Sequence, residues 1–129
     1  MGDAVGAIAD DTAVIEMTDA PKASVASALV GRGLKQLVTG AKASAVNDLR
    51  QVLILSDVPA DQVVFASNPL FRLLWFGDDH VAADEVLDRF ATLATTWPKD
   101  QSVEAVTQFL SNLASAEMRE GWPRAWHRL

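Results

Sequence analysis

Cysteine and tyrosine are both absent from this 129-residue chain. Without cysteine there is no disulfide, no thiolate metal site and no thiol nucleophile, and nothing in the composition points to an oxidising compartment. Tryptophan, in contrast, occurs four times, at Trp75, Trp97, Trp122 and Trp126. So many indoles in a short chain indicate either a tryptophan-rich core, which is the plainer interpretation, or a binding interface.

Targeting and membrane signals are also lacking. The segment from Met1 to Asp19 has five acidic residues and no lysine or arginine, whereas a secretory signal needs a basic start followed by an uninterrupted apolar stretch. The longest apolar runs, such as Val52–Leu55, are far too short to span a bilayer. We therefore expect a cytoplasmic protein that makes no use of a membrane.

Positive charge is scarce, because the formal net charge is −6. Nucleic-acid binding depends on a basic surface, so we expect no nucleic acid among the partners. Residues 22–50 carry five bases and one acid, residues 57–104 carry nine acids and three bases, and the C-terminal end turns basic again. Oppositely charged segments can lie against each other within one fold, which we favour, or form two poles that face different partners.

Length and apolar content predict one folded domain. A chain of this size buries about two-thirds of its unfolded surface, and half of its residues are apolar. Residues 1–17 are rich in alanine, glycine and aspartate, and we expect a flexible or extended N-terminal segment there. Residues 18–129 have apolar positions at helical spacing, which predicts an all-α, single-domain bundle of five to six helices.

The clearest helical pattern lies in the second half of the chain. Apolar residues from Val81 to Thr96 form one stripe, and a second stripe runs from Ser102 to about Gly121. The Trp97-Pro98 break between them predicts a C-terminal antiparallel helical hairpin, which we expect to be the core of the bundle.

Three other stretches are less clear. Asn68-Pro69 predicts the start of a short, buried helix that ends at Gly77, with Asp78 or Asp79 capping the next helix. Gly31 and Gly33 lie in the middle of a helical pattern, so that helix either breaks or is closely approached by another. Residues 52–66 include two apolar runs that could be strands of an α/β fold, although their context favours helices.

Candidate catalytic and metal-binding patterns are weak. Asp78, Asp79, His80 and Asp84 are close in sequence, but acids at a helix start are more simply explained as caps. There is no glycine-rich phosphate loop after a strand and no nucleophile elbow, and the serines lie in helical contexts without a nearby histidine. We therefore expect no metal, no cofactor and no enzymatic activity.

Aromatic residues provide the main candidates for binding. Trp122, Arg124, Trp126 and Arg128 combine the residue types that are enriched at protein interfaces. They favour a small acidic protein-interaction module, such as an adaptor, regulator or inhibitor, whose partner is another protein with a basic face. A homo-oligomer formed through the same tail is a further possibility. The alternative is a helical bundle that binds a small apolar ligand between its helices, with Phe71, Trp75, Phe76 and Phe90 as pocket walls.

Overall fold

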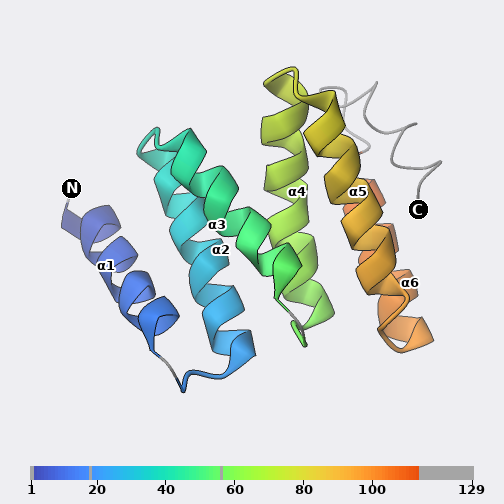
Figure 1. Ribbon diagram of the computed structural model, residues 1–129, viewed down its shortest axis with the longest axis horizontal. Helices are drawn as coiled ribbons and strands as arrows, with labels where there is room; N and C mark the ends of the chain where they lie inside the picture. Colours follow the sequence, from blue (N-terminus) through green and yellow to red (C-terminus); the bar gives the residue numbers. More distant parts are fainter. Residues whose placement is uncertain (1, 18, 56, 114–129) are drawn as a thin grey trace.

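The computed structural model describes residues 2–17, 19–55 and 57–113, and these residues form six α-helices with no β-strand among them (Figure 1). The helices are α1 (Gly2–Glu16), α2 (Lys22–Val38), α3 (Lys42–Ile54), α4 (Ala60–Phe76), α5 (His80–Ala94) and α6 (Lys99–Leu113). The all-α fold expected from the apolar periodicity is confirmed. The α/β alternative is wrong, because Val52 lies in the last turn of α3 and Val63 lies inside α4.

Helix α4 is the centre of the bundle. Helices α1 to α5 pack each against the next, and α6 lies behind α5 in the view of Figure 1. Helix α4 contacts α2, α3, α5 and α6. The predicted antiparallel arrangement of α5 and α6 is visible, but both helices pack mainly on α4 and touch each other only lightly. The expectation that this hairpin forms the core is therefore wrong.

Burial continues along the whole length of α4, and this explains why Pro69 does not begin a helix. The buried positions of α4 are Val63, Val64, Ala66, Ser67, Leu70, Phe71 and Leu74. They lie on both sides of Pro69, which is inside the helix. A proline in a helix interior costs about 3 kcal/mol through its missing N–H and its ring. Burial of the apolar residues on either side offsets that cost, so the predicted helix start at Asn68-Pro69 is wrong.

Three phenylalanines from three helices meet in the core. Phe71, Phe90 and Phe109 are all fully buried. The ring of Phe109 lies edge-on to Phe71, with 6.4 Å between centroids, and 4.6 Å from Phe90. Such aromatic pairs contribute about 0.5–1.5 kcal/mol each beyond the burial of their area. The contact with Phe71 holds α6 to α4, and the contact with Phe90 holds α6 to α5.

Within the segment that was expected to be flexible or extended, residues Gly2–Glu16 form helix α1. Alanine is abundant in this segment and has the highest helix propensity of all residues. Polar contacts attach α1 to α2: Lys35 Nζ lies 2.8 Å from Asp11 Oδ2, and Arg32 Nη1 donates a hydrogen bond to Thr12 Oγ1 at 3.1 Å. The acidic first segment thus lies against the basic second one, as we favoured.

Arg32 and Asp48 form a buried ion pair between α2 and α3. The guanidinium donates two hydrogen bonds of 2.6 Å to the two carboxylate oxygens, and the Asp48 side chain is only 4% exposed. The hydrogen bond to Asp48 raises the pKa of Arg32, and outweighs the lowering effect of burial. The charge of Arg32 is therefore neutralised inside the fold by Asp48.

Helix α2 runs unbroken across Gly31 and Gly33. A Cβ atom added at Gly33 would lie 3.0 Å from the buried side chain of Leu49, and one at Gly31 would lie 3.1 Å from Asp11 Oδ2. Of the two explanations for these glycines, close approach by neighbouring helices is therefore the one that the structure supports.

Candidate functional site

The predicted partner-binding residues Trp122, Arg124, Trp126 and Arg128 lie outside the described residues. Their role in binding stays a prediction.

The four aromatic residues that were predicted to wall an apolar pocket differ widely in burial. Phe71 and Phe90 are fully buried in the core, and Phe76 is 58% exposed. Trp75 is partly buried and stacks on Phe71, with 5.8 Å between ring centroids. None of the four rings lines either of the two hollows that are described in the following paragraphs. The apolar-ligand site therefore stays a prediction.

Of the acids near the start of α5, Asp79 is the cap of the helix. Asp79 Oδ1 accepts a hydrogen bond from the backbone N–H of Ala82 at 3.1 Å, so the predicted cap is confirmed. The His80 ring stacks on the Trp75 indole, with 3.9 Å between centroids and 12° between ring planes. Within residues 2–113, as far as they are described, no three acidic or histidine side chains are placed to hold a metal ion.

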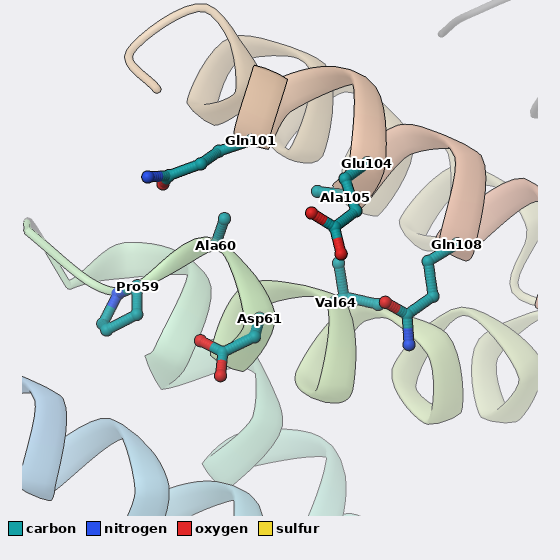
Figure 2. A pocket seen from close by; sticks show the side chains of 8 residues that line it. All are labelled: Pro59, Ala60, Asp61, Val64, Gln101, Glu104, Ala105 and Gln108. Carbon is teal, nitrogen blue, oxygen red and sulfur yellow. The ribbon is translucent and has the colours of Figure 1, made fainter. Parts of the chain in front are cut away.

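A cleft of about 250 Å³ lies between the start of α4 and the middle of α6 (Figure 2). Its lining residues come from the start of α4 and from one face of α6. They are Pro59, Ala60, Asp61 and Val64 on the first side, and Gln101, Glu104, Ala105 and Gln108 on the second. We call this hollow the acidic cleft. Because its volume is below the usual range of small-molecule pockets, about 300–1,000 Å³, it suits a single side chain.

The packing of α6 on α4 decides which residues line the acidic cleft. Ala105 is buried and Phe109 is fully buried, so this face of α6 is turned toward α4. Glu104 and Gln108, each one residue before a buried position, therefore flank the contact. In Figure 2 the carboxylate of Glu104 points toward α4, and Gln101 extends above Ala60. The small side chain of Ala105 leaves space between the helices that a larger residue would fill.

Two exposed carboxylates, one from each helix, are among the residues that line the acidic cleft; in Figure 2 that of Glu104 points toward α4, and that of Asp61 points away from α6. Asp61, in the first turn of α4, accepts a hydrogen bond from the N–H of Gln62 at 2.9 Å. Neither Asp61 nor Glu104 forms an ion pair with any residue in the described part of the chain. The floor includes Val64, which is buried and apolar. An apolar floor beside two carboxylates can hold an aliphatic stem that ends in a positive charge.

Two of the three bases of residues 57–104 are engaged elsewhere, and the third is Lys99, the exposed first residue of α6. Arg89 Nε donates a hydrogen bond to the Leu53 carbonyl at 2.7 Å, and Arg72 Nη2 donates one to the Asn112 carbonyl at 2.9 Å. Arg72 is eleven residues from Asp61 on the same helix, or about 16 Å along its axis. No described guanidinium therefore neutralises the cleft at close range.

A second hollow, of about 420 Å³, continues from the acidic cleft along α4 and shares Val64 with it. Its lining residues come from α2, α4 and the end of α6: Val30, Leu34, Val64, Phe65, Asn68, Pro69, Arg72 and Asn112. We call it the α4 groove. Asn68 Oδ1 and Arg72 Nε are buried here without a hydrogen-bond partner among the described residues. Each such atom costs about 1–3 kcal/mol when it stays unsatisfied.

Inspection of the sequence missed both hollows. Asp61 and Glu104 read as ordinary acids on the solvent-facing sides of helices, and Gln101 and Gln108 carry no motif. The one local signal was Pro59, which precedes the first turn of α4 and marks where the helix begins. The rest depends on α6 lying beside α4, which is a long-range property of the fold.

No described helix combines the length and the apolar content needed to cross a bilayer. Comparisons of the chain with protein-family models, with characterised proteins and with solved structures find no match.

Proposed function

We propose that this chain is a non-enzymatic protein-interaction module whose acidic cleft binds a lysine or arginine side chain of a partner protein. The observation that carries the proposal is the pair of exposed carboxylates, Asp61 and Glu104, that line a cleft with an apolar floor. Neither has a basic partner in the described part of the chain. A basic side chain from another protein would supply one.

The cleft matches both parts of such a side chain. The aliphatic stem packs on Val64 and Ala105, while the cation pairs with the carboxylates and donates hydrogen bonds to the amide oxygens of the glutamines. Exposed ion pairs contribute about 0.2–1 kcal/mol each, so the cleft selects the partner more than it provides affinity. The net charge of −6 adds long-range attraction for a basic surface.

Exposure of the two acids supports binding rather than catalysis. General acid–base chemistry uses carboxylates whose pKa values are shifted by burial or by close partners. Asp61 and Glu104 are both open to solvent, where water already satisfies them. They are suited to an exchangeable ionic contact with a partner protein.

An NMR titration with a defined peptide tests the proposal. The probe is a short, end-capped peptide with one lysine among alanine and leucine residues, and its control replaces the lysine with norleucine. We expect the lysine peptide to shift the amide signals of Val64 and Ala105. The double variant Asp61→Asn, Glu104→Gln should weaken binding about tenfold, which corresponds to about 1.4 kcal/mol.

Glu85→Gln is the matched control variant, because it removes one negative charge from an exposed position of α5 that does not line the cleft. It should bind the lysine peptide almost as well as the unmodified chain. Equal binding of the lysine and norleucine peptides, or a double variant that binds as well as Glu85→Gln, would show that the cleft does not recognise a cation.

A further inference from the structure

We propose that the partner segment is a short amphipathic helix, which places its basic side chain in the acidic cleft and a large apolar side chain, seven residues further along, in the α4 groove. This inference rests on the proposed function of the acidic cleft, and it names the kind of partner that the same face of the molecule selects. It follows from the arrangement of the residues that line the two hollows.

The acidic cleft and the α4 groove lie along one face of α4. The residues of α4 that line them recur at the three- and four-residue spacing of a single helix face: Asp61, Val64, Phe65, Asn68 and Arg72. The lining residues of α6 have the same spacing: Gln101, Glu104, Ala105, Gln108 and Asn112. In both helices the cleft comes first and the groove second, so α4 and α6 run in the same direction and border one continuous trough.

The length of this trough fits a helix of about three turns. Asp61 and Arg72 are eleven residues apart, which is about 16 Å along α4. The described residues contain no β-strand whose edge a partner strand could extend. A partner helix that lies nearly parallel to α4 has side chains on one face every seven residues, about 10 Å apart. Asp61 in the cleft and Asn68 in the groove have that same separation.

The α4 groove is the apolar end of the trough. Leu34 on α2 and Phe65 on α4 line it, and these large apolar side chains are 41% and 47% exposed. The volume of about 420 Å³ lies within the usual range of ligand pockets, so the groove admits a side chain as large as phenylalanine. Burial of that side chain supplies the affinity that an exposed ion pair does not.

Charge sets the direction of the partner helix. Asp61 and Glu104 lie at one end of the trough, and Arg72 lies at the other. The N-terminus of a helix carries a partial positive charge and its C-terminus a partial negative charge. The partner helix therefore has its N-terminus at the cleft, and its basic residue precedes its apolar residue in sequence.

Two peptides of identical composition test the inference. Both are end-capped helical peptides of alanine and glutamine with one lysine and one phenylalanine. In the matched peptide the phenylalanine follows the lysine by seven residues, and in the control peptide by five, which turns the ring about 140° away from the lysine. We expect the matched peptide to bind at least about tenfold more tightly. It should shift the amide signals of Leu34 and Phe65 together with those of Val64 and Ala105.

A substitution in the groove tests the same contact from the other side. Phe65→Gln removes an apolar wall and should make the two peptides bind equally. Phe76→Gln is the matched control, because Phe76 is a 58% exposed ring of the same helix that lines neither hollow. It should keep the full preference, and circular dichroism checks that both variants fold. A preference that survives in Phe65→Gln, or that is lost in both variants, would overturn the inference.

Failure of this inference differs from failure of the proposed function. Equal binding of the two peptides, with a preference for lysine over norleucine retained, overturns the inference and leaves the acidic cleft as the binding site. Loss of the lysine preference in the matched peptide overturns both. Amide signals of Leu34 and Phe65 that change with protein concentration in the absence of peptide would assign the groove to a second copy of the chain, and would also overturn the inference.

Discussion

Replacement of Asp48 by asparagine is the sharpest test of how α1, α2 and α3 hold together. Asp48 accepts two hydrogen bonds of 2.6 Å from Arg32, and its side chain is 4% exposed, against 20% for the arginine. Asp48→Asn keeps the shape but removes the charge. It leaves a guanidinium with little access to water, whose remaining acceptors are one amide oxygen and Thr12 Oγ1.

The expected cost follows from these exposures. Removing one partner of a fully buried ion pair costs about 3–5 kcal/mol. Arg32 reaches some solvent, and the asparagine oxygen can still accept one bond, so we expect Asp48→Asn to lower the free energy of unfolding by about 2–3 kcal/mol. The more exposed pair of Lys35 and Asp11, with side chains 37% and 19% exposed, provides the control. Lys35→Met should cost about 0.5–1 kcal/mol.

Urea unfolding followed by tryptophan fluorescence measures both costs, with Arg32→Met and the double variant completing a mutant cycle for the buried pair. Added salt should reduce the cost of Lys35→Met and leave that of Asp48→Asn almost unchanged. A cost below about 1 kcal/mol for Asp48→Asn, or one no larger than that of Lys35→Met, would refute the reasoning from burial.

The pH dependence of the same pair has a definite sign. The hydrogen bond to Asp48 raises the pKa of Arg32 above its already high ordinary value. An arginine whose pKa is higher in the folded state than in the unfolded state stabilises the fold at every pH below its unfolded-state pKa. That stability is lost only as the pH rises through the folded-state pKa. Between about pH 6 and pH 9 the arginine stays charged, so the cost of Arg32→Met should be constant. A cost that changes over this range would contradict the assignment.

Three further substitutions test the packing, each by urea unfolding. Phe109→Ala removes the ring between Phe71 and Phe90 and should lower the free energy of unfolding by about 3–5 kcal/mol. Phe76→Ala, at an exposed ring, should lower it by less than about 1 kcal/mol. Similar costs for the two variants would show that Phe109 is not central to the packing. Gly33→Ala should destabilise by about 1 kcal/mol, because its Cβ meets the fully buried Leu49 at 3.0 Å, while Gly31→Ala meets only the end of the Asp11 side chain and should be nearly neutral; the reverse order would contradict the close approach of α3. Pro69→Ala should stabilise by about 1–2 kcal/mol, since residue 69 then donates to the Phe65 carbonyl; a destabilised variant would mean that the proline ring is essential to the packing.

Local patterns were enough to predict the strongest helices. Helix α5 was expected from Val81 to Thr96 and spans His80–Ala94, because its apolar stripe is regular and Asp79 caps it. The same kind of reasoning failed at Pro69. A proline normally marks a helix start, but buried residues on both sides keep α4 continuous there.

Long-range contacts account for the features that the sequence concealed. Helix α1 is held by Asp11 and Thr12, whose partners on α2 are 24 and 20 positions away in the sequence. No local signal marks these residues. The acidic cleft has the same origin, because Asp61 and Glu104 come together only when α6 packs beside α4. Predicting such a site requires the register of two helices that are distant in sequence, which periodicity does not provide.

The most direct measurement for the central claim is the affinity of the end-capped lysine peptide for the unmodified chain at low salt. The acidic cleft predicts about tenfold tighter binding than for the norleucine peptide, with the largest amide shifts at Val64 and Ala105, and loss of that preference in Asp61→Asn, Glu104→Gln. Equal affinity for the two peptides, or a preference that survives loss of both carboxylates, would contradict it.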